Sequence, residues 1–154
     1  MGETRWLDER EARAWRGLIG VQQRLLAVLE RELVQDVGLS GAEYTLLVPL
    51  SEARGGVLRA RDLGRLVGWE RSRVSHQVTR MAKRGLVVRE ECGEDARGSM
   101  VRLTDTGWSS IVAAAPAHVA AVRRYFVSVL TDAELDVIGP ALERVLDRLP
   151  GIDE

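Results

Sequence analysis

One segment, residues 60–107 of the 154-residue chain, constrains the fold more than any other part of the sequence. A short stretch with helical spacing of apolar residues stops at Gly68, and a second stretch rich in Ser, Arg and His follows at once. Gly85, two strand-like runs and Thr104 complete the order. A helix, a tight turn, a helix and a β-hairpin in this order predict a winged helix-turn-helix. We therefore expect a mainly α fold with a small β-hairpin wing.

Long helical patterns flank this segment on both sides. Apolar residues recur at helical spacing over residues 8–35, and Gly38 should end that helix. On the C-terminal side, Thr104 should cap a helix that runs to about residue 129. Thr131 should then cap a last helix that reaches about residue 149.

The predicted winged helix occupies about residues 41–104 between these flanks. Its first helix should cover about 41–53, because Ser40 and Glu43 have the spacing of a capping box. Pro49 should cause a kink or an early end in that helix. The other expected elements are helices at 60–67 and 70–84, a very short strand at 57–58, and strands at 86–88 and 100–103. With flanking helices at about 8–35 and 105–149, the chain 1–154 is predicted to be one domain.

Composition excludes several classes of protein. Hydrophobic residues make up 45% of the chain, yet no uninterrupted apolar run reaches the roughly 18 residues of a membrane-spanning helix. The charged N-terminal sequence lacks the apolar centre of a signal peptide, so we expect a cytoplasmic location. One cysteine and two histidines cannot form a disulfide framework or a structural zinc site. No catalytic constellation is recognisable, so we expect no enzyme, no metal and no cofactor.

Charge is distributed unevenly along the chain, although its formal total is only −1. Residues 54–104 hold 12 basic and 6 acidic residues, a surplus of +6. The remainder holds 10 basic and 17 acidic residues, a surplus of −7. Because DNA binding depends on local positive charge, the middle of the chain is the candidate surface.

The helix predicted at 70–84 has the side chains that suit a major groove. Val74, Val78 and Met81 share one face, which should pack inward. The other sides carry short hydroxyls, which allow close approach, and arginines, which can bind guanine or phosphate. An ordinary solvated surface helix is the alternative, but the preceding helix and the following hairpin favour DNA. The candidate DNA-binding residues on this helix are Arg71, Ser72, Arg73, Ser75, His76, Thr79 and Arg80.

Arg97, beside Gly98 in the predicted hairpin tip, is a further DNA-binding candidate. A long cation at this position could reach the minor groove. The alternative is that Arg97 only pairs with Asp95 or Glu94.

These residues resemble the MarR (multiple antibiotic resistance regulator) family of bacterial transcription regulators. The resemblance rests on RSRVSHQVTRM at 71–81, KRGLVVR at 83–89 and DARGSMVRLTDTG at 95–107, of which the last is the most specific. By position, Ser72, Arg73, Ser75, His76 and Arg80 match the family's recognition helix, and Arg97 matches its wing-tip arginine. The family often has Asp-Arg-Arg in the wing where this chain has Asp-Ala-Arg, so one wing cation is missing.

The resemblance implies a homodimer that spans a pseudo-palindromic operator. The first and last helices would interlock with those of a second copy. A physical reason supports the dimer: the first and last helices carry more apolar residues than one small winged domain can cover. An intramolecular bundle is the alternative.

Members of the family often bind small aromatic or phenolic acids between the dimer helices and the winged domain. Trp15 and Trp108 are the candidate effector-binding residues, although core packing is the default for tryptophan at helical spacing. Some members sense oxidants through cysteine, but Cys92 has acidic neighbours, which disfavour the reactive thiolate.

We therefore expect a homodimeric, sequence-specific DNA-binding transcription regulator that acts as a ligand-responsive repressor. The alternative is a winged-helix module that uses the same helix face to bind an acidic protein partner.

Overall fold

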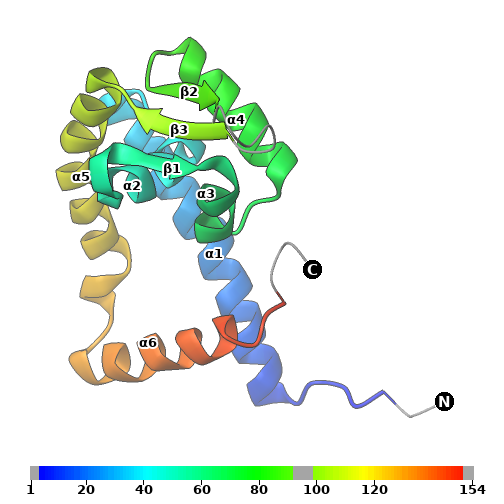
Figure 1. Ribbon diagram of the computed structural model, residues 1–154. Helices are drawn as coiled ribbons and strands as arrows, with labels where there is room; N and C mark the ends of the chain where they lie inside the picture. The colour runs from blue at the N-terminus through cyan, green and yellow to red at the C-terminus, as the bar shows by residue number, and fades with distance from the viewer. Residues whose placement is uncertain (1–3, 92–98, 151–154) are drawn as a thin grey trace.

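The computed structural model of the chain describes residues 4–91 and 99–150. Six α-helices and a small sheet confirm the mainly α fold with a winged helix-turn-helix (Figure 1). The elements, in chain order, are α1 (Glu9–Val37), α2 (Gly41–Glu52), the 3₁₀ turn η1 (Arg54–Gly56), β1 (Val57–Arg59), α3 (Ala60–Val67), α4 (Arg71–Lys83), β2 (Val87–Glu91), β3 (Ser99–Leu103), α5 (Asp105–Tyr125), the 3₁₀ turn η2 (Val127–Val129) and α6 (Asp132–Leu146).

Side-chain caps set the starts of four helices. The expected capping box of Ser40 and Glu43 is present at the start of α2, and Thr104 caps α5 as expected. Thr131 caps α6 and also forms a capping box. Asp8 does the same for α1, although the sequence analysis did not identify it. Each cap satisfies backbone N–H groups that have no partner within the helix, so these boundaries follow from local chemistry.

One predicted helix end is close to the observed one, and two differ. α2 ends at Glu52, next to the predicted end at about residue 53, and the early end that Pro49 offered as one alternative does not occur, because Pro49 removes only one backbone donor while Leu46, Leu47 and Leu50 are fully buried. The helix expected to reach residue 129 ends at Tyr125, because the backbone leaves the helical region at the next residue. The last helix ends at Leu146, and the chain continues through tighter turns to residue 149.

The sheet has three antiparallel strands in the order β1-β3-β2. β1 pairs with β3 and thereby anchors the β2–β3 hairpin, which we call the wing, to the start of α3. Val87, Val101 and Leu103 point into the core and are at most 5% exposed. The wing root is therefore part of the same core as the helices.

The hydrophobic core lies in the winged helix and includes the adjoining parts of α1 and α5. Its most deeply buried members come mainly from α2, α3 and α4, and Val87 and Val101 of the strands join them. Leu33 of α1 and Ile111 of α5 extend the core to the two long helices. α1 and α5 pack against each other beside this core and run in opposite directions (Figure 1). α6 lies crosswise at the far end of the molecule, away from α4 and the sheet (Figure 1).

Thr104 and Gly107 fasten the wing to α5. The Thr104 hydroxyl donates to the Gly85 carbonyl at 2.5 Å and accepts from the Gly107 amide at 3.0 Å. A Cβ on Gly107 would lie 2.1 Å from the Leu86 carbonyl oxygen, so only glycine fits this approach. The spacing of threonine and glycine in LTDTG at 103–107 therefore has a packing reason.

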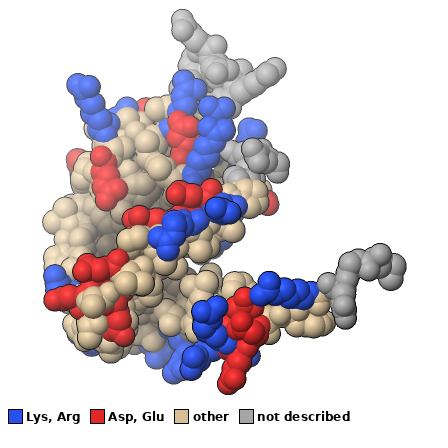
Figure 2. Space-filling model, turned by 90° about the horizontal axis from the view of Figure 1, so that it is seen from below, with Lys and Arg blue, Asp and Glu red and all other residues tan. Residues whose placement is uncertain are grey.

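The surface around α6 and the N-terminal half of α1 carries many apolar side chains. α6 has no buried residue. Seen from the side of α6, basic and acidic side chains are intermixed with uncharged surface (Figure 2). The exposed apolar residues here include Trp15, Leu18, Val21 and Leu26 of α1 and Val137, Val145 and Leu146 of α6.

None of the helices within residues 4–91 and 99–150 combines the length and the apolar character needed to span a bilayer.

Candidate DNA interface

Helix α4 is held with its polar face outward. Val74, Val78 and Met81 are at most 1% exposed and anchor the opposite face in the core. This confirms the inward face predicted from the sequence. Of the seven candidate DNA-binding residues on this helix, Ser75 is half-buried and the other six are exposed: Arg71, Ser72, Arg73, His76, Thr79 and Arg80. α4 therefore presents a cationic, hydroxyl-bearing face to its surroundings.

The turn between α3 and α4 is tight. Gly68 ends α3 with φ of 68°, a left-handed conformation that favours glycine. The Trp69 amide then donates to the Gly64 carbonyl at 2.9 Å. A Cβ on Gly64 would lie 2.9 Å from the Trp69 carbonyl oxygen, so glycine allows α3 and the turn to approach closely. This turn sets the angle between α3 and α4 within the winged helix.

Two arginines are ordered by contacts at this face. The Arg73 guanidinium stacks over the Trp69 ring at 3.9 Å from the ring centre, a cation–π contact. Arg89 of β2 donates to the Ser75 hydroxyl at 3.2 Å. Arg89 was not among the predicted site residues, because nothing local in the sequence places a strand residue beside the helix. The signal that could have found it is its position in the basic run that follows the helix.

The wing root is braced by an ion pair between adjacent strands. Arg102 donates to both carboxylate oxygens of Glu90, at 2.7 and 3.1 Å, and also to the Gly55 carbonyl. This hydrogen bonding lowers the pKa of Glu90 and raises that of Arg102. The predicted wing-tip residue Arg97, with Cys92, Glu94 and Asp95, lies outside the described residues.

Comparison with known proteins gives the family. A family model described as the MarR family matches residues 37–98. The crystal structure of AbsC, a MarR family transcriptional regulator from Streptomyces coelicolor, has 40% sequence identity and a TM-score of 0.87, and covers 94% of this chain and 97% of its own. This chain belongs to the MarR family of transcriptional regulators.

Other solved structures agree with the assignment. Sco3205, a MarR family regulator from Streptomyces coelicolor solved in complex with DNA, is 36% identical with a TM-score of 0.91, and the match covers 98% of this chain and 94% of that one. PcaV from the same organism, solved with its natural ligand, shares the fold at 24% identity and a TM-score of 0.72, over 94% of this chain and 99% of that one. No curated protein matches the sequence significantly.

The MarR-family fold does not bring the two candidate effector residues together within one chain. Trp15 is 56% exposed on α1, and Trp108 is 38% exposed on α5, where its ring lies against Gly56. The C-terminal end of α1 at Val37 lies beside the start of α5. Trp15 is 22 residues upstream of Val37 on a continuous helix, which corresponds to about 33 Å. One small effector cannot contact both rings of the same chain.

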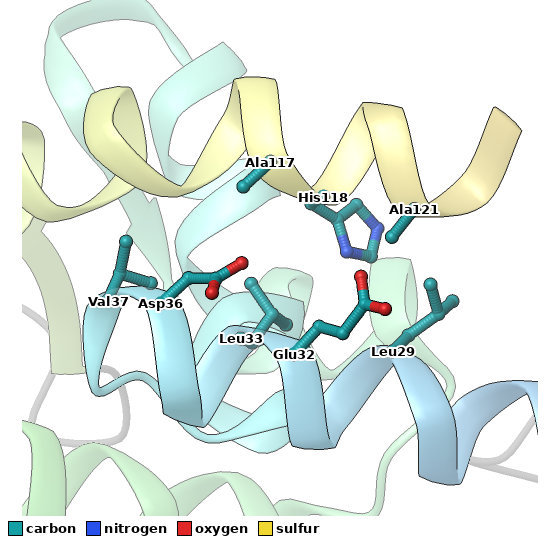
Figure 3. A pocket seen from close by; sticks show the side chains of 8 residues that line it. All are labelled: Leu29, Glu32, Leu33, Asp36, Val37, Ala117, His118 and Ala121. Carbon is teal, nitrogen blue, oxygen red and sulfur yellow. The ribbon is translucent and has the colours of Figure 1, made fainter. Parts of the chain in front are cut away.

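A small pocket lies instead between α1 and α5 (Figure 3). His118 of α5 points into it, and its ring centre lies 4.3 Å from that of Tyr44 of α2. The His118 Nδ1 atom is buried and has no hydrogen-bond partner among residues 4–91 and 99–150, and burial lowers the pKa of this histidine. Glu32 also points toward the ring in Figure 3, but its carboxylate already accepts from the Tyr125 hydroxyl at 2.6 Å. His118 was not among the residues predicted from the sequence, because nothing local in the sequence places it beside Tyr44.

Among the described residues, no group of three or more His, Cys, Asp or Glu side chains could hold a metal ion.

Proposed function

We propose that this MarR-family chain forms a homodimer, that each copy places α4 in a major groove of operator DNA, and that it acts by binding rather than by catalysis. The observation that carries the proposal is the outward polar face of α4, which is fixed by the buried face on its other side. Support comes from Sco3205, whose structure contains DNA. A cytoplasmic location, where DNA is accessible, belongs to the same proposal.

Different side chains of α4 would have different roles in DNA recognition. Arg73 and Arg80 are long and exposed, so they would bind guanine edges or phosphates. Ser72, Ser75 and Thr79 are short and permit close approach of the helix to the bases. The remaining candidates are Arg71 and His76 on α4, Arg97 in the wing for the minor groove, and Arg89 next to Ser75.

Binding to random duplex DNA, with selection of the bound sequences, tests this directly. We expect a pseudo-palindromic site whose half-sites lie about one helical turn apart. On that site, Arg73→Ala and Arg80→Ala should weaken binding, and each lost phosphate contact should reduce the salt dependence by about 0.9 in the logarithmic slope. Arg123→Ala removes the same charge from the exposed surface of α5 and should change neither quantity. Equal affinity of all three variants and the wild type would reject the assignment.

The dimer is proposed because α6 and the N-terminal half of α1 expose apolar surface that the rest of the described chain leaves uncovered. Leu146 of α6 is 66% exposed, and a large apolar patch is unfavourable in water. A second copy in a two-fold arrangement would bury these surfaces and match the symmetry of the operator.

The mass in solution tests the dimer. The wild type should have twice the 17.1 kDa mass of the chain, and Leu146→Glu should shift it towards the monomer. Leu66→Glu is the matched control, because Leu66 is 64% exposed on α3 within the winged helix. A wild-type monomer at micromolar concentration, or equal masses for both variants, would contradict the proposed interface.

We further propose that a small aromatic or phenolic effector, as the family resemblance implies, acts where α1, α2 and α5 meet. The contact between Tyr44 and His118 and the Nδ1 atom, which has no partner among the described residues, favour this place. The helices must separate to admit a ring, because the gap between α1 and α5 has no space for even a water molecule. Salicylate is a suitable probe, and its binding can be followed by a shift in melting temperature. We expect His118→Ala to abolish the shift. Trp15→Phe and Trp108→Phe test the two tryptophans separately, since a single molecule could contact only one of them in each chain.

No observation favours the alternative of a winged-helix module that binds a protein partner. It would predict weak, sequence-independent DNA binding, which the same selection experiment detects.

A further inference from the structure

Arg84, the residue that follows the last turn of α4, connects this helix to the junction of α1 and α2. Its guanidinium donates to the Glu43 carboxylate at 2.5 Å and to the Gly38 carbonyl at 3.0 Å. Gly38 is the residue that ends α1, and Glu43 lies in the first turn of α2. One side chain therefore joins the ends of three helices.

The Glu43 carboxylate is buried and bound to groups of its own chain. Glu43 is only 4% exposed, and its carboxylate also accepts from the Ser40 amide at 2.9 Å in the capping box of α2. A buried carboxylate needs a partner, and Arg84 supplies the positive charge. The cation also lies at the C-terminal end of α1, where the helix dipole favours it.

Few other contacts hold α4 directly to α1. The main neighbours of α4 in the described chain are α3 and β2, both parts of the winged helix itself. Apolar packing is non-directional and permits small shifts, whereas a guanidinium that binds two acceptors fixes an orientation. Arg84 and Glu43 thus form a directional link between the helix that faces outward for DNA and the long helix α1.

We propose that Arg84 and Glu43 are positioning residues that fix the tilt of α4 relative to α1 and so set the distance between the two recognition helices of the dimer. This inference rests on the proposed function, because it assumes that α4 contacts DNA and that α1 belongs to the dimer interface.

A small rotation of α4 about Arg84 would move the opposite end of the helix by a large distance. Ser72 lies 12 residues before Arg84 along α4, which corresponds to about 18 Å. A pivot of about 10° at Arg84 would move the N-terminal end of α4 by about 3 Å, close to the axial rise of about 3.4 Å for one base pair. Loss of the link should therefore reduce the discrimination between operators that differ in half-site spacing. Recognition of the bases within each half-site should stay the same.

The test compares operators with the natural spacing and with one base pair added to or removed from the centre. For the wild type, we expect each change to weaken binding roughly tenfold, because half-site spacing is fixed by the dimer. For Arg84→Gln, we expect the decrease in affinity relative to the natural spacing to be about threefold or less on at least one altered operator. The ratio of two affinities of the same protein cancels any loss of folded fraction, so a merely stabilising role would leave it unchanged.

Two further variants keep the test clear. Arg84→Gln leaves Glu43 buried without its counter-charge, so the double variant Glu43→Gln with Arg84→Met removes both charges and should relax the spacing to the same degree. Arg102→Gln is the matched control, since it breaks an arginine–glutamate pair within the wing and not one between α4 and α1. It should retain the wild-type ratio. An unchanged ratio in both Arg84 variants, or an equal relaxation in Arg102→Gln, overturns the inference.

A measurement without DNA separates this inference from the proposed function. Spin labels at Thr79→Cys in a Cys92→Ser background report the distance between the two α4 helices of a dimer. The distance distribution should be narrow with Arg84 present and broader in Arg84→Gln. Equal widths would refute the positioning role even if the protein bound no operator, whereas failure of the wild type to bind any duplex would refute only the proposed function.

Discussion

Gly107 offers the sharpest test of how the wing is fastened to α5. In Gly107→Ala, the new Cβ would lie 2.1 Å from the Leu86 carbonyl oxygen and 3.0 Å from the Leu103 side chain. An ordinary contact begins at 3.4 Å, so the carbonyl and α5 must separate by about 1.3 Å. The same carbonyl accepts the Thr104 amide at 3.2 Å, and this hydrogen bond should weaken as the two segments separate.

The magnitude follows from three contributions. Overpacking against a rigid backbone costs about 1–3 kcal/mol, and a weakened hydrogen bond costs about 0.5–1.5 kcal/mol. Alanine is favoured over glycine within a helix by about 1 kcal/mol, which offsets part of this. We expect the free energy of unfolding to fall by about 2 kcal/mol, which corresponds to a decrease in melting temperature of about 4–8 °C for a chain of this size.

Urea unfolding followed by circular dichroism, at one fixed protein concentration, measures this loss. Gly41→Ala is the matched control, because Gly41 also lies in the first turn of a helix but its Cβ would meet only the flexible Glu30 side chain at 3.5 Å. It should be as stable as the wild type or slightly more stable. If Gly107→Ala unfolds within about 0.5 kcal/mol of the wild type, the close approach does not constrain this position.

Three other outcomes are expected. Burial lowers the pKa of His118 below its usual 6.5, so the unfolded chain takes up a proton first as the pH falls below 6.5, and stability decreases. Stability measured across this range should depend less on pH in His118→Gln; an equal slope would contradict the assignment. Hydrogen bonds from Arg102 lower the pKa of Glu90, so Glu90→Gln should be less stable at neutral pH, and its difference from the wild type should vanish as the pH falls well below 4.5. Trp69→Leu removes the ring beneath Arg73 and should weaken operator binding about two- to fivefold in a titration, with unchanged binding as the adverse result.

Local chemistry made much of the fold predictable from the sequence. The starts of α2, α5 and α6 follow from Ser40, Thr104 and Thr131, because a cap acts within four residues of itself. The buried face of α4 followed from the spacing of its apolar residues. The alternative of an early end at Pro49 does not occur, because the loss of one backbone hydrogen bond is small beside the burial of the leucines around it.

Contacts between distant residues could not be predicted in the same way. Arg84 and Glu43 are 41 positions apart, and their local sequence predicts only a cation at the end of a helix and an acid in a capping box. Likewise, Arg89 reaches Ser75 only because β2 folds back beside α4. These pairings depend on how the elements pack, and local spacing carries no information about that. The outward face of the candidate site was therefore predictable, whereas the side chains that order and orient it were not.

The exposed state of α6 has a consequence for how this protein behaves when it is scarce. A helix of 15 residues with no fully buried side chain, and with only a few half-buried ones such as Leu135 and Ile138, is marginal in water. Its order must therefore come from association, so the melting temperature should rise with protein concentration. On dilution, α6 should lose its helical structure while the core around α2, α3 and α4 persists. The concentration of the protein alone would then determine what fraction of the molecules is dimeric.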